Sequence, residues 1–280
     1  MYQSENKPKL TLFGEEISIS PEFLRLLEKL RLRIPDSQKR MRETSKFMQT
    51  IDFSAQIISH FKKYKKPIKL LDCACGNSYL SFILYYLLTE IYYKQVRIIG
   101  VDVQENLIDK CNKISEEMNF DGLEFHCADI NNYSPKDKID GIYALHACDI
   151  ATDYAIAKTI NLKATAGFYA SCCHRQISSQ VLPEKSPFIS ELLRNTPFKE
   201  KVGAFITDTT RQLLLEGFNY RTKIFEFTPV RWTDKNIMLK AELVGKPSLT
   251  PKINAYYTFI SKHQLKSILS NILKTSLDQD

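Results

Sequence analysis

The residues best suited to bind a ligand or take part in a reaction follow the first strongly apolar run of the chain, 68–71. That run ends in Asp72 and continues through a loop of small residues that contains Ala74, Gly76 and Asn77, before an apolar segment with helical character begins near Tyr79. A strand, a tight turn and a helix N-terminus in this order present backbone N–H groups to a ligand at the carboxyl edge of a sheet. A second apolar run, 95–101, ends in Asp102, near the place where nucleotide-binding folds carry a carboxylate for ribose hydroxyls. Together these features indicate a nucleoside cofactor.

The loop departs from a glycine-rich pattern. Ala74 and Ser78 occupy the two flanking positions where such loops often carry glycine, and only Gly76 remains. A positive φ is costly for residues with a Cβ atom, so we expect either a turn that L-residues tolerate or a backbone that lies slightly further from the ligand.

Two later motifs combine histidine and cysteine. His146 and Cys148 follow an apolar run at 139–145, and Cys172, Cys173 and His174 follow another at 166–171. If the two runs are adjacent parallel strands, their ends meet at the same sheet edge and bring these side chains together.

This group of residues leaves two chemistries open. Transfer of a chemical group to a hydroxyl needs a base, which His174 or His146 could supply. It also needs a cation, such as Arg175, to stabilise the developing alkoxide. Transfer to carbon 5 of a pyrimidine needs a thiolate nucleophile, for which Cys172 or Cys173 is a candidate. Inert packing of the cysteines is the simpler alternative. The thiols and His174 lack the paired spacing of common metal sites, so no metal is expected.

The elements that must position these residues alternate along the chain. Hydrophobic periodicity predicts strands separated by helices, which is typical of a parallel sheet covered on both faces. Two further runs, 220–228 and 236–244, predict an appended β-hairpin. The expected strands are 68–73, 96–102, 123–128, 139–145 and 166–171, and the expected helices are 78–92, 105–119, 150–161, 186–195 and 203–217.

Five parallel strands followed by a hairpin form the strand inventory of class I S-adenosylmethionine-dependent methyltransferases. The predicted fold is therefore α/β and Rossmann-like, with a mostly parallel seven-stranded sheet, helices on both faces, a C-terminal β-hairpin and additional N-terminal helices. In this fold Asp72 would orient the loop and the methionyl amino group, Asp102 would bind the ribose hydroxyls, and Asp129 would bind the adenine amino group.

The two histidine-cysteine motifs carry a closer resemblance. Leu-His-x-Cys followed by Ala-Thr-Asp, and then Cys-Cys-His after the next strand, is similar to the tRNA acceptor-stem 2′-O-methyltransferases and to a broader set of methyltransferase-like proteins. The likeness spans about residues 37–244. Arg175 stands where the tRNA enzymes usually carry a second histidine, and their N-terminal zinc-finger elements are missing here. The resemblance implies S-adenosyl-L-methionine as cofactor, held by Asp72, Ala74, Gly76, Asn77, Tyr79, Asp102, Val103, Asp129, Ile130 and Leu145.

Composition and charge indicate where the protein is located and which kind of substrate it binds. The 280-residue chain has 44% hydrophobic and 25% charged residues and no long apolar run. We therefore expect a cytoplasmic protein that does not enter membranes. We also expect a monomer or a homodimer. The net charge is +7, and basic residues cluster at Lys39–Lys46 and Lys62–Lys66. An RNA substrate, tRNA or rRNA, would explain both clusters. A protein or small-molecule acceptor, or a non-catalytic binding module with this fold, stays open.

Three segments organise the chain. We expect an N-terminal helical extension at 1–66, an S-adenosylmethionine-binding domain at 67–245 and a C-terminal helical segment at 246–280. Helices are predicted from Pro21 to about Ile34, where Pro35 follows, and from about Asp36 to His60. Arg211, Arg231 and Trp232 are expected near the opening of the crevice, with Trp232 offering a stacking surface for a base.

Overall fold

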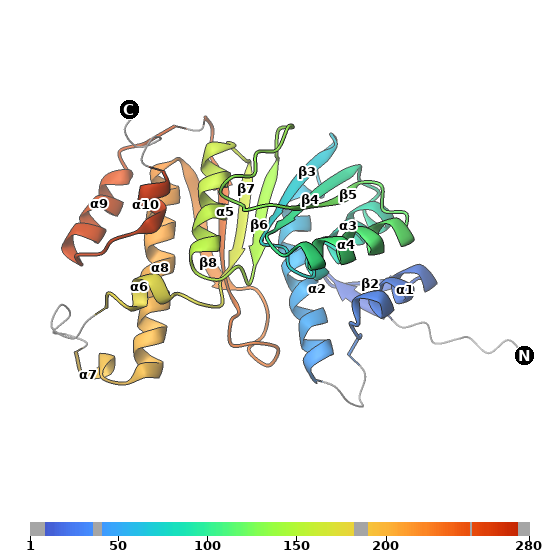
Figure 1. The fold of residues 1–280 in the computed structure, drawn as a ribbon, viewed down its shortest axis with the longest axis horizontal. Coiled ribbons are helices and arrows are strands. Elements are labelled where there is room, and N and C mark those ends of the chain that lie inside the picture. The colour runs from blue at the N-terminus through green and yellow to red at the C-terminus, as the bar shows by residue number, and fades with distance from the viewer. Residues whose placement is uncertain (1–8, 36–40, 182–189, 247, 274–280) are drawn as a thin grey trace, which may run out of the picture.

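A seven-stranded sheet forms the centre of the molecule (Figure 1). The computed structural model describes residues 9–35, 41–181, 190–246 and 248–273. The spatial strand order is β5-β4-β3-β6-β7-β9-β8. The strands are β3 (Ile68–Cys73), β4 (Val96–Asp102), β5 (Leu123–Cys127), β6 (Gly141–Leu145), β7 (Ala166–Ala170), β8 (Tyr220–Glu226) and β9 (Ile237–Leu243).

The first five of these strands are parallel, and the last two are not. β3 lies between β4 and β6, with Asp72 opposite Gly100 on one side and Tyr143 on the other. β8 and β9 pair antiparallel, and β9 joins the sheet antiparallel to β7. The strand order reverses between β3 and β6, which is the point at which open α/β sheets bind ligands. The predicted fold class is confirmed, including the hairpin.

Alternation along the strands explains why both faces are covered. Ile68 and Leu70 of β3 pack into one hydrophobic core, whereas Leu71 and Cys73 pack into the other. The first core is closed by α1 (Pro21–Leu30), α2 (Met41–Phe61), α3 (Tyr79–Tyr86) with its π-helical continuation at Leu87–Ile91, and α4 (Glu105–Glu117). The second is closed by α5 (Ile150–Asn161), α8 (Thr196–Gly217), α9 (Ile253–Lys262) and α10 (Ile268–Ile272).

Several boundaries differ from the sequence-based expectation. The N-terminal region is not only helical, because β1 (Lys9–Leu12) and β2 (Glu15–Ser18) form a separate hairpin. Helix α1 ends at Leu30, since Arg31 adopts a left-handed conformation. Helix α8 begins at Thr196, seven residues before the predicted start, with a proline in its first turn.

Other segments are shorter than expected. The predicted helix 186–195 corresponds to α7 (Ser190–Leu193), and its first part lies outside the described residues. A short helix, α6 (Arg175–Ser178), was not predicted. The C-terminal segment forms two helices, α9 and α10.

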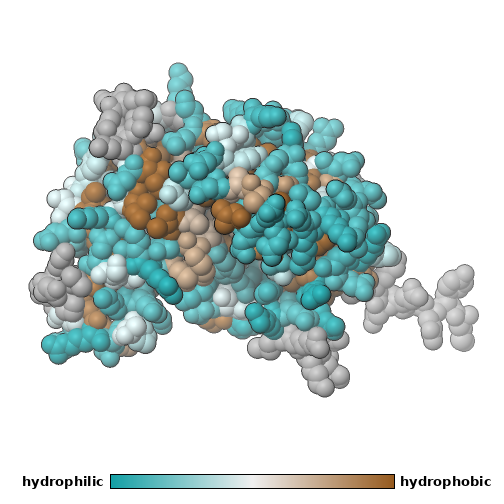
Figure 2. Space-filling model, in the orientation of Figure 1, coloured by the Kyte–Doolittle hydropathy of each residue, from teal (hydrophilic) through white to brown (hydrophobic). Residues whose placement is uncertain are grey.

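The described residues contain no helix that is long and apolar enough to cross a membrane. Figure 2 shows hydrophilic residues over most of one face, with hydrophobic residues in smaller groups between them. Charged and polar side chains therefore dominate this face.

Candidate active site

A cavity of about 300 Å³ opens at the carboxyl edge of the sheet, where β3 and β6 end. The loop after β3 forms one side, Leu145 and His146 form another, and α2 forms the third. The lining residues are Lys46, Gln49, Thr50, Asp72, Ala74, Cys75, Gly76, Asn77, Ser78, Tyr79, Leu80, Leu145 and His146. The predicted cofactor residues Asp72, Ala74, Gly76, Asn77, Tyr79 and Leu145 are among them, whereas Asp102, Val103, Asp129 and Ile130 are not.

The loop after β3 takes a more strained path than expected. Ala74, Gly76 and Ser78 have φ values of 58°, 53° and 54°. The expectation that the turn would suit L-residues was therefore wrong, because two residues with a Cβ atom adopt the left-handed region at a cost of about 1 kcal/mol each or more. Strain of this kind persists where surrounding contacts enforce it, and ligand-binding loops are a common place for it.

Asp72 forms the acidic floor of the cavity. Its side chain is buried, and its Oδ2 accepts hydrogen bonds from the hydroxyls of Ser81, at 2.5 Å, and Ser78, at 3.4 Å. The Ser81 hydroxyl in turn accepts from the Tyr143 hydroxyl at 2.6 Å, since its own proton is given to Asp72. Burial raises the pKa of Asp72 to about 7, against the lowering effect of the serine hydrogen bonds. The carboxyl is thus poised to ionise when a cation binds beside it.

Asp102 is held in place by the loop it supports. The backbone N–H of Gly76 donates to Oδ2 at 2.8 Å, and the N–H of Gln104 donates to Oδ1 at 3.0 Å. Each carboxylate oxygen keeps a further lone pair for a ligand hydroxyl. Only 8% of Asp102 is exposed, so it would bind such hydroxyls in a partly desolvated position.

The adenine side of the predicted site lies beyond the cavity, along the ends of β4 and β5. Asp129 is exposed, and its Oδ1 accepts from the backbone N–H of Asn131 at 2.7 Å. Val103 is 65% exposed at the end of β4, whereas Ile130 is largely buried in the core under the sheet. Carboxylates therefore follow three adjacent strands, β3, β4 and β5, in the order expected from the sequence.

These residues fit an S-adenosylmethionine molecule on chemical grounds. A buried carboxyl in the cavity suits the methionyl ammonium, a backbone-held carboxylate suits a ribose diol, and an exposed carboxylate suits the adenine amino group. Added atoms at Gly76 would meet nothing within 4 Å, so space is open above the loop. The position of each carboxylate on its own strand end makes one extended ligand the simplest occupant.

Helix α2 supplies a wall that the sequence did not reveal. Gln49 donates from Nε2 to the Trp232 carbonyl oxygen at 3.1 Å and to the Ser45 hydroxyl at 3.0 Å. These two acceptors fix the orientation of the amide, so its Oε1 must accept from the Nε2–H of His146, at 2.8 Å. The other ring nitrogen of His146, Nδ1, is left without a proton.

His146 is the only predicted catalytic residue that lines the cavity. Although part of His146 is exposed, desolvation of its ring and the positive charge of Lys46 lower the pKa of His146. The imidazole is therefore neutral at physiological pH, with its basic nitrogen fixed by the hydrogen bond to Gln49. Its backbone takes φ = 60°, another left-handed residue in the site.

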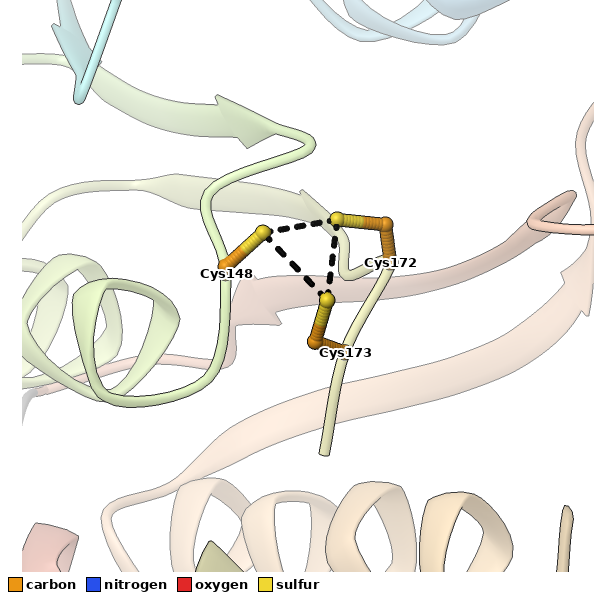
Figure 3. Close-up of side chains that lie close together, drawn as sticks. All are labelled: Cys148, Cys172 and Cys173. Atoms are coloured by element: carbon orange, nitrogen blue, oxygen red, sulfur yellow. Dashed lines mark hydrogen bonds between the residues drawn. The ribbon is translucent and has the colours of Figure 1, made fainter. Parts of the chain in front are cut away.

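The remaining predicted catalytic residues follow β7 and do not line the cavity. The adjacency of β6 and β7 is confirmed, and it places the Cys148, Cys172 and Cys173 thiols together (Figure 3). Burial and the neighbouring thiols raise the pKa of Cys172, which disfavours a free thiolate there. Arg175 is exposed at the start of α6.

His174 turns away from the thiols toward α8. Its Nε2 lies 3.5 Å from Asp208 Oδ1 and is buried without a hydrogen bond. Its ring is thus placed against α8, and it is not among the residues lining the cavity.

The buried Arg211 binds both the loop that follows β6 and the loop that follows β7. Arg211 was expected near the crevice opening, but only 2% of it is exposed, because the helix α8 turns it inward. Its guanidinium donates to Asp153 at 2.7 Å, to the Asp149 carbonyl at 2.8 Å and to the Ser171 hydroxyl at 3.0 Å. This role could not be predicted from the residue pattern, since a single arginine in a polar helix resembles a surface residue.

A comparison with known protein families identifies the family of the chain. Residues 39–180, just over half of the chain, match a family model described as a methyltransferase domain. The chain belongs to this methyltransferase family. It is an S-adenosylmethionine-dependent methyltransferase. No curated protein matches the chain in sequence.

Solved structures of similar shape are distant in sequence. A magnesium protoporphyrin IX methyltransferase from Synechocystis, with bound S-adenosylhomocysteine, is 14% identical, with 80% of this chain and 93% of that chain covered and a TM-score of 0.46. An rRNA methylase from Streptococcus thermophilus is 11% identical, with 75% and 100% covered and a TM-score of 0.41. Likeness at this level carries no information about the acceptor.

Proposed function

We propose that this methyltransferase acts on RNA, with tRNA and rRNA as the leading acceptors, and that His146 removes the proton from the methylated atom. The observation that carries the assignment of the base is the position of His146 on the cavity wall, with a defined basic nitrogen. A general base within the cavity is what transfer to a hydroxyl or amine requires.

Basic side chains around the entrance support a polyanionic acceptor. Lys46 lines the cavity, with its ammonium 5.2 Å from the centre of the Tyr79 ring, and Arg42 lies one turn earlier on the same face of α2. The exposed Arg231 packs its guanidinium 5.0 Å from the centre of the Trp232 ring, in the β8–β9 loop that α2 anchors. Such cations attract phosphates but do not specify the reacting atom.

The second basic cluster has a different position from the first. Lys62–Lys66 precedes β3, at the amino edge of the sheet, whereas the cavity lies at the carboxyl edge, about 20 Å away along a six-residue strand. Lys66 forms an ion pair with Asp140 at 2.5 Å, and Lys62 lies over the Phe13 ring. We therefore assign the main phosphate contacts to the first turns of α2.

The test begins with mass spectrometry of nucleosides from total RNA of cells with and without the gene. The purified protein is then incubated with labelled S-adenosylmethionine and RNA, protein or small-molecule fractions of the deletion strain. The proposal requires label in RNA and a modified nucleoside that disappears with the gene. Label confined to proteins or small molecules would overturn it.

Three histidine variants test the base. His146→Gln should lower turnover at least about 100-fold, which is the lower range for a lost general base, with little change in cofactor affinity. His126→Gln, at an exposed position within β5, is the matched control and should keep full turnover. A similar loss in His174→Gln but not in His146→Gln would transfer the role to His174.

A further inference from the structure

Three thiols converge beside the active-site cavity on loops from two different strands. Cys148 follows β6, and Cys172 and Cys173 follow β7 (Figure 3). Their Sγ atoms are 2.8 Å apart for the pair 148–172, 3.5 Å for 148–173 and 3.6 Å for 172–173. Each sulfur therefore contacts both of the others, and the side chains point to one common centre.

The observed spacing is close to that of a thiolate-metal site. Three sulfurs at 2.3 Å from one Zn²⁺ in tetrahedral geometry lie about 3.8 Å from one another. Two of the three separations differ from this value by a few tenths of an ångström, and the third must widen by about 1 Å. A disulfide would instead have to close to about 2.05 Å and would use only two of the three thiols.

The frame around the thiols is rigid. Both carboxylate oxygens of Asp149 accept from the backbone N–H of Gln176, at 3.1 and 3.2 Å, and the N–H of Asp149 donates to the Cys173 carbonyl at 3.3 Å. Arg211 donates hydrogen bonds to the Asp149 carbonyl oxygen and the Ser171 hydroxyl. Supporting contacts of this kind hold ligands in position before a metal arrives.

Neutral thiols gain little from this arrangement. A thiol is a weak donor and a weak acceptor, so three of them facing one another form poor hydrogen bonds. Four other cysteines of the chain, Cys73, Cys75, Cys111 and Cys127, stand outside the cluster. Convergence of three soft ligands is explained by a soft or borderline cation.

We propose that Cys148, Cys172 and Cys173 bind one Zn²⁺ ion as thiolates beside the active-site cavity. Binding displaces the thiol protons to solvent, and three protein ligands leave a fourth tetrahedral position for water or a substrate atom. The Cys148 and Cys172 thiols both lie within 3.8 Å of the His146 carbonyl oxygen, so the ion would sit directly behind the proposed base.

The experiment measures metal binding and not activity. The full chain is stripped with chelator under reducing conditions and titrated with Zn²⁺ against a chromophoric competitor, and with Co²⁺ to record thiolate charge-transfer absorption. The wild type should bind one equivalent and show the charge-transfer band. Cys148→Ser, Cys172→Ser and Cys173→Ser should each lose at least about 100-fold in affinity, whereas the control Cys127→Ser should bind as the wild type does.

Other outcomes overturn the proposal. One is a wild type that takes up no more Zn²⁺ than Cys148→Ser. Another is loss of two hydrogen atoms from the intact mass on removal of reductant, at the same rate with and without Zn²⁺, which would assign the cluster to a disulfide. Circular dichroism of the metal-free proteins checks that the serine variants are folded, and Cys148→Ala repeats the titration if a serine variant is not.

Discussion

The pKa of Asp72 predicts how cofactor affinity depends on pH. Burial raises this pKa from its ordinary value of 3.8 to about 7, so the folded protein without cofactor holds the carboxyl protonated up to near neutrality. The unfolded chain releases that proton near pH 4. The free energy of unfolding therefore decreases as pH rises from about 4 to about 7, by about 4 kcal/mol in all.

A cation at this carboxyl reverses the effect. The ammonium of S-adenosylmethionine favours the ionised form of Asp72, so binding releases the proton. With a pKa of about 7 in the free protein and a much lower pKa in the complex, the dissociation constant should fall about 16-fold between pH 5.5 and pH 7.0. At pH 6.5 binding should release about 0.8 proton for the same reason.

Calorimetry in two buffers with different ionisation enthalpies measures both quantities. Asp72→Asn should bind more weakly at pH 7, lose most of the pH dependence and release almost no proton. Asp129→Asn is the control, because it removes an exposed carboxylate of the same site and leaves Asp72 in place. The reasoning fails if the wild-type affinity is independent of pH over this range, or if Asp72→Asn keeps the wild-type slope.

Three further changes test other contacts. Asp102→Ala should weaken cofactor binding by about 10- to 100-fold, because it removes a charged acceptor for ribose hydroxyls, and unchanged affinity in calorimetry would contradict that assignment. Arg211→Leu leaves the buried carboxylate of Asp153 without its partner and should lower the free energy of unfolding by about 3 to 5 kcal/mol in denaturant titrations, whereas a loss under 1 kcal/mol would contradict a structural ion pair. Lys46→Met removes a charge that lowers the pKa of His146, so the acidic limb of the turnover profile should move to higher pH, and a limb at the wild-type pH would show that His146 is not the base.

Strand-end carboxylates were predictable because they depend on local patterns. Asp72, Asp102 and Asp129 each close an apolar run, and parallel strands bring such ends to one edge whatever the details of packing. The meeting of Cys148 with Cys172 follows from the same rule, since β6 and β7 are neighbours.

Long-range packing was not predictable in the same way. The periodicity of α2 indicates which side of the helix is buried, but not that Gln49 meets His146 across 97 positions of the chain. The hairpin at 9–18 was not predicted, because its strands are only four residues long. Phe13 and Gly14 form its turn, and both have positive φ. The inward position of Arg211 depends on three partners from other elements.

If the acceptor is RNA and His146 is the base, as we propose, Lys46 connects substrate binding to proton removal in this site. Its charge is one reason why the pKa of His146 is lowered, and under the proposed function the same ammonium would bind an RNA phosphate at the entrance. A bound phosphate would offset that charge and raise the pKa of His146, so the base would become stronger when the acceptor arrives. Hydrogen bonding to Gln49 keeps Nδ1 as the basic atom throughout, because the amide is fixed by the Trp232 carbonyl. The basicity of His146 is thus tied by geometry to the occupancy of the entrance, and an acceptor without a phosphate at Lys46 would meet a weaker base.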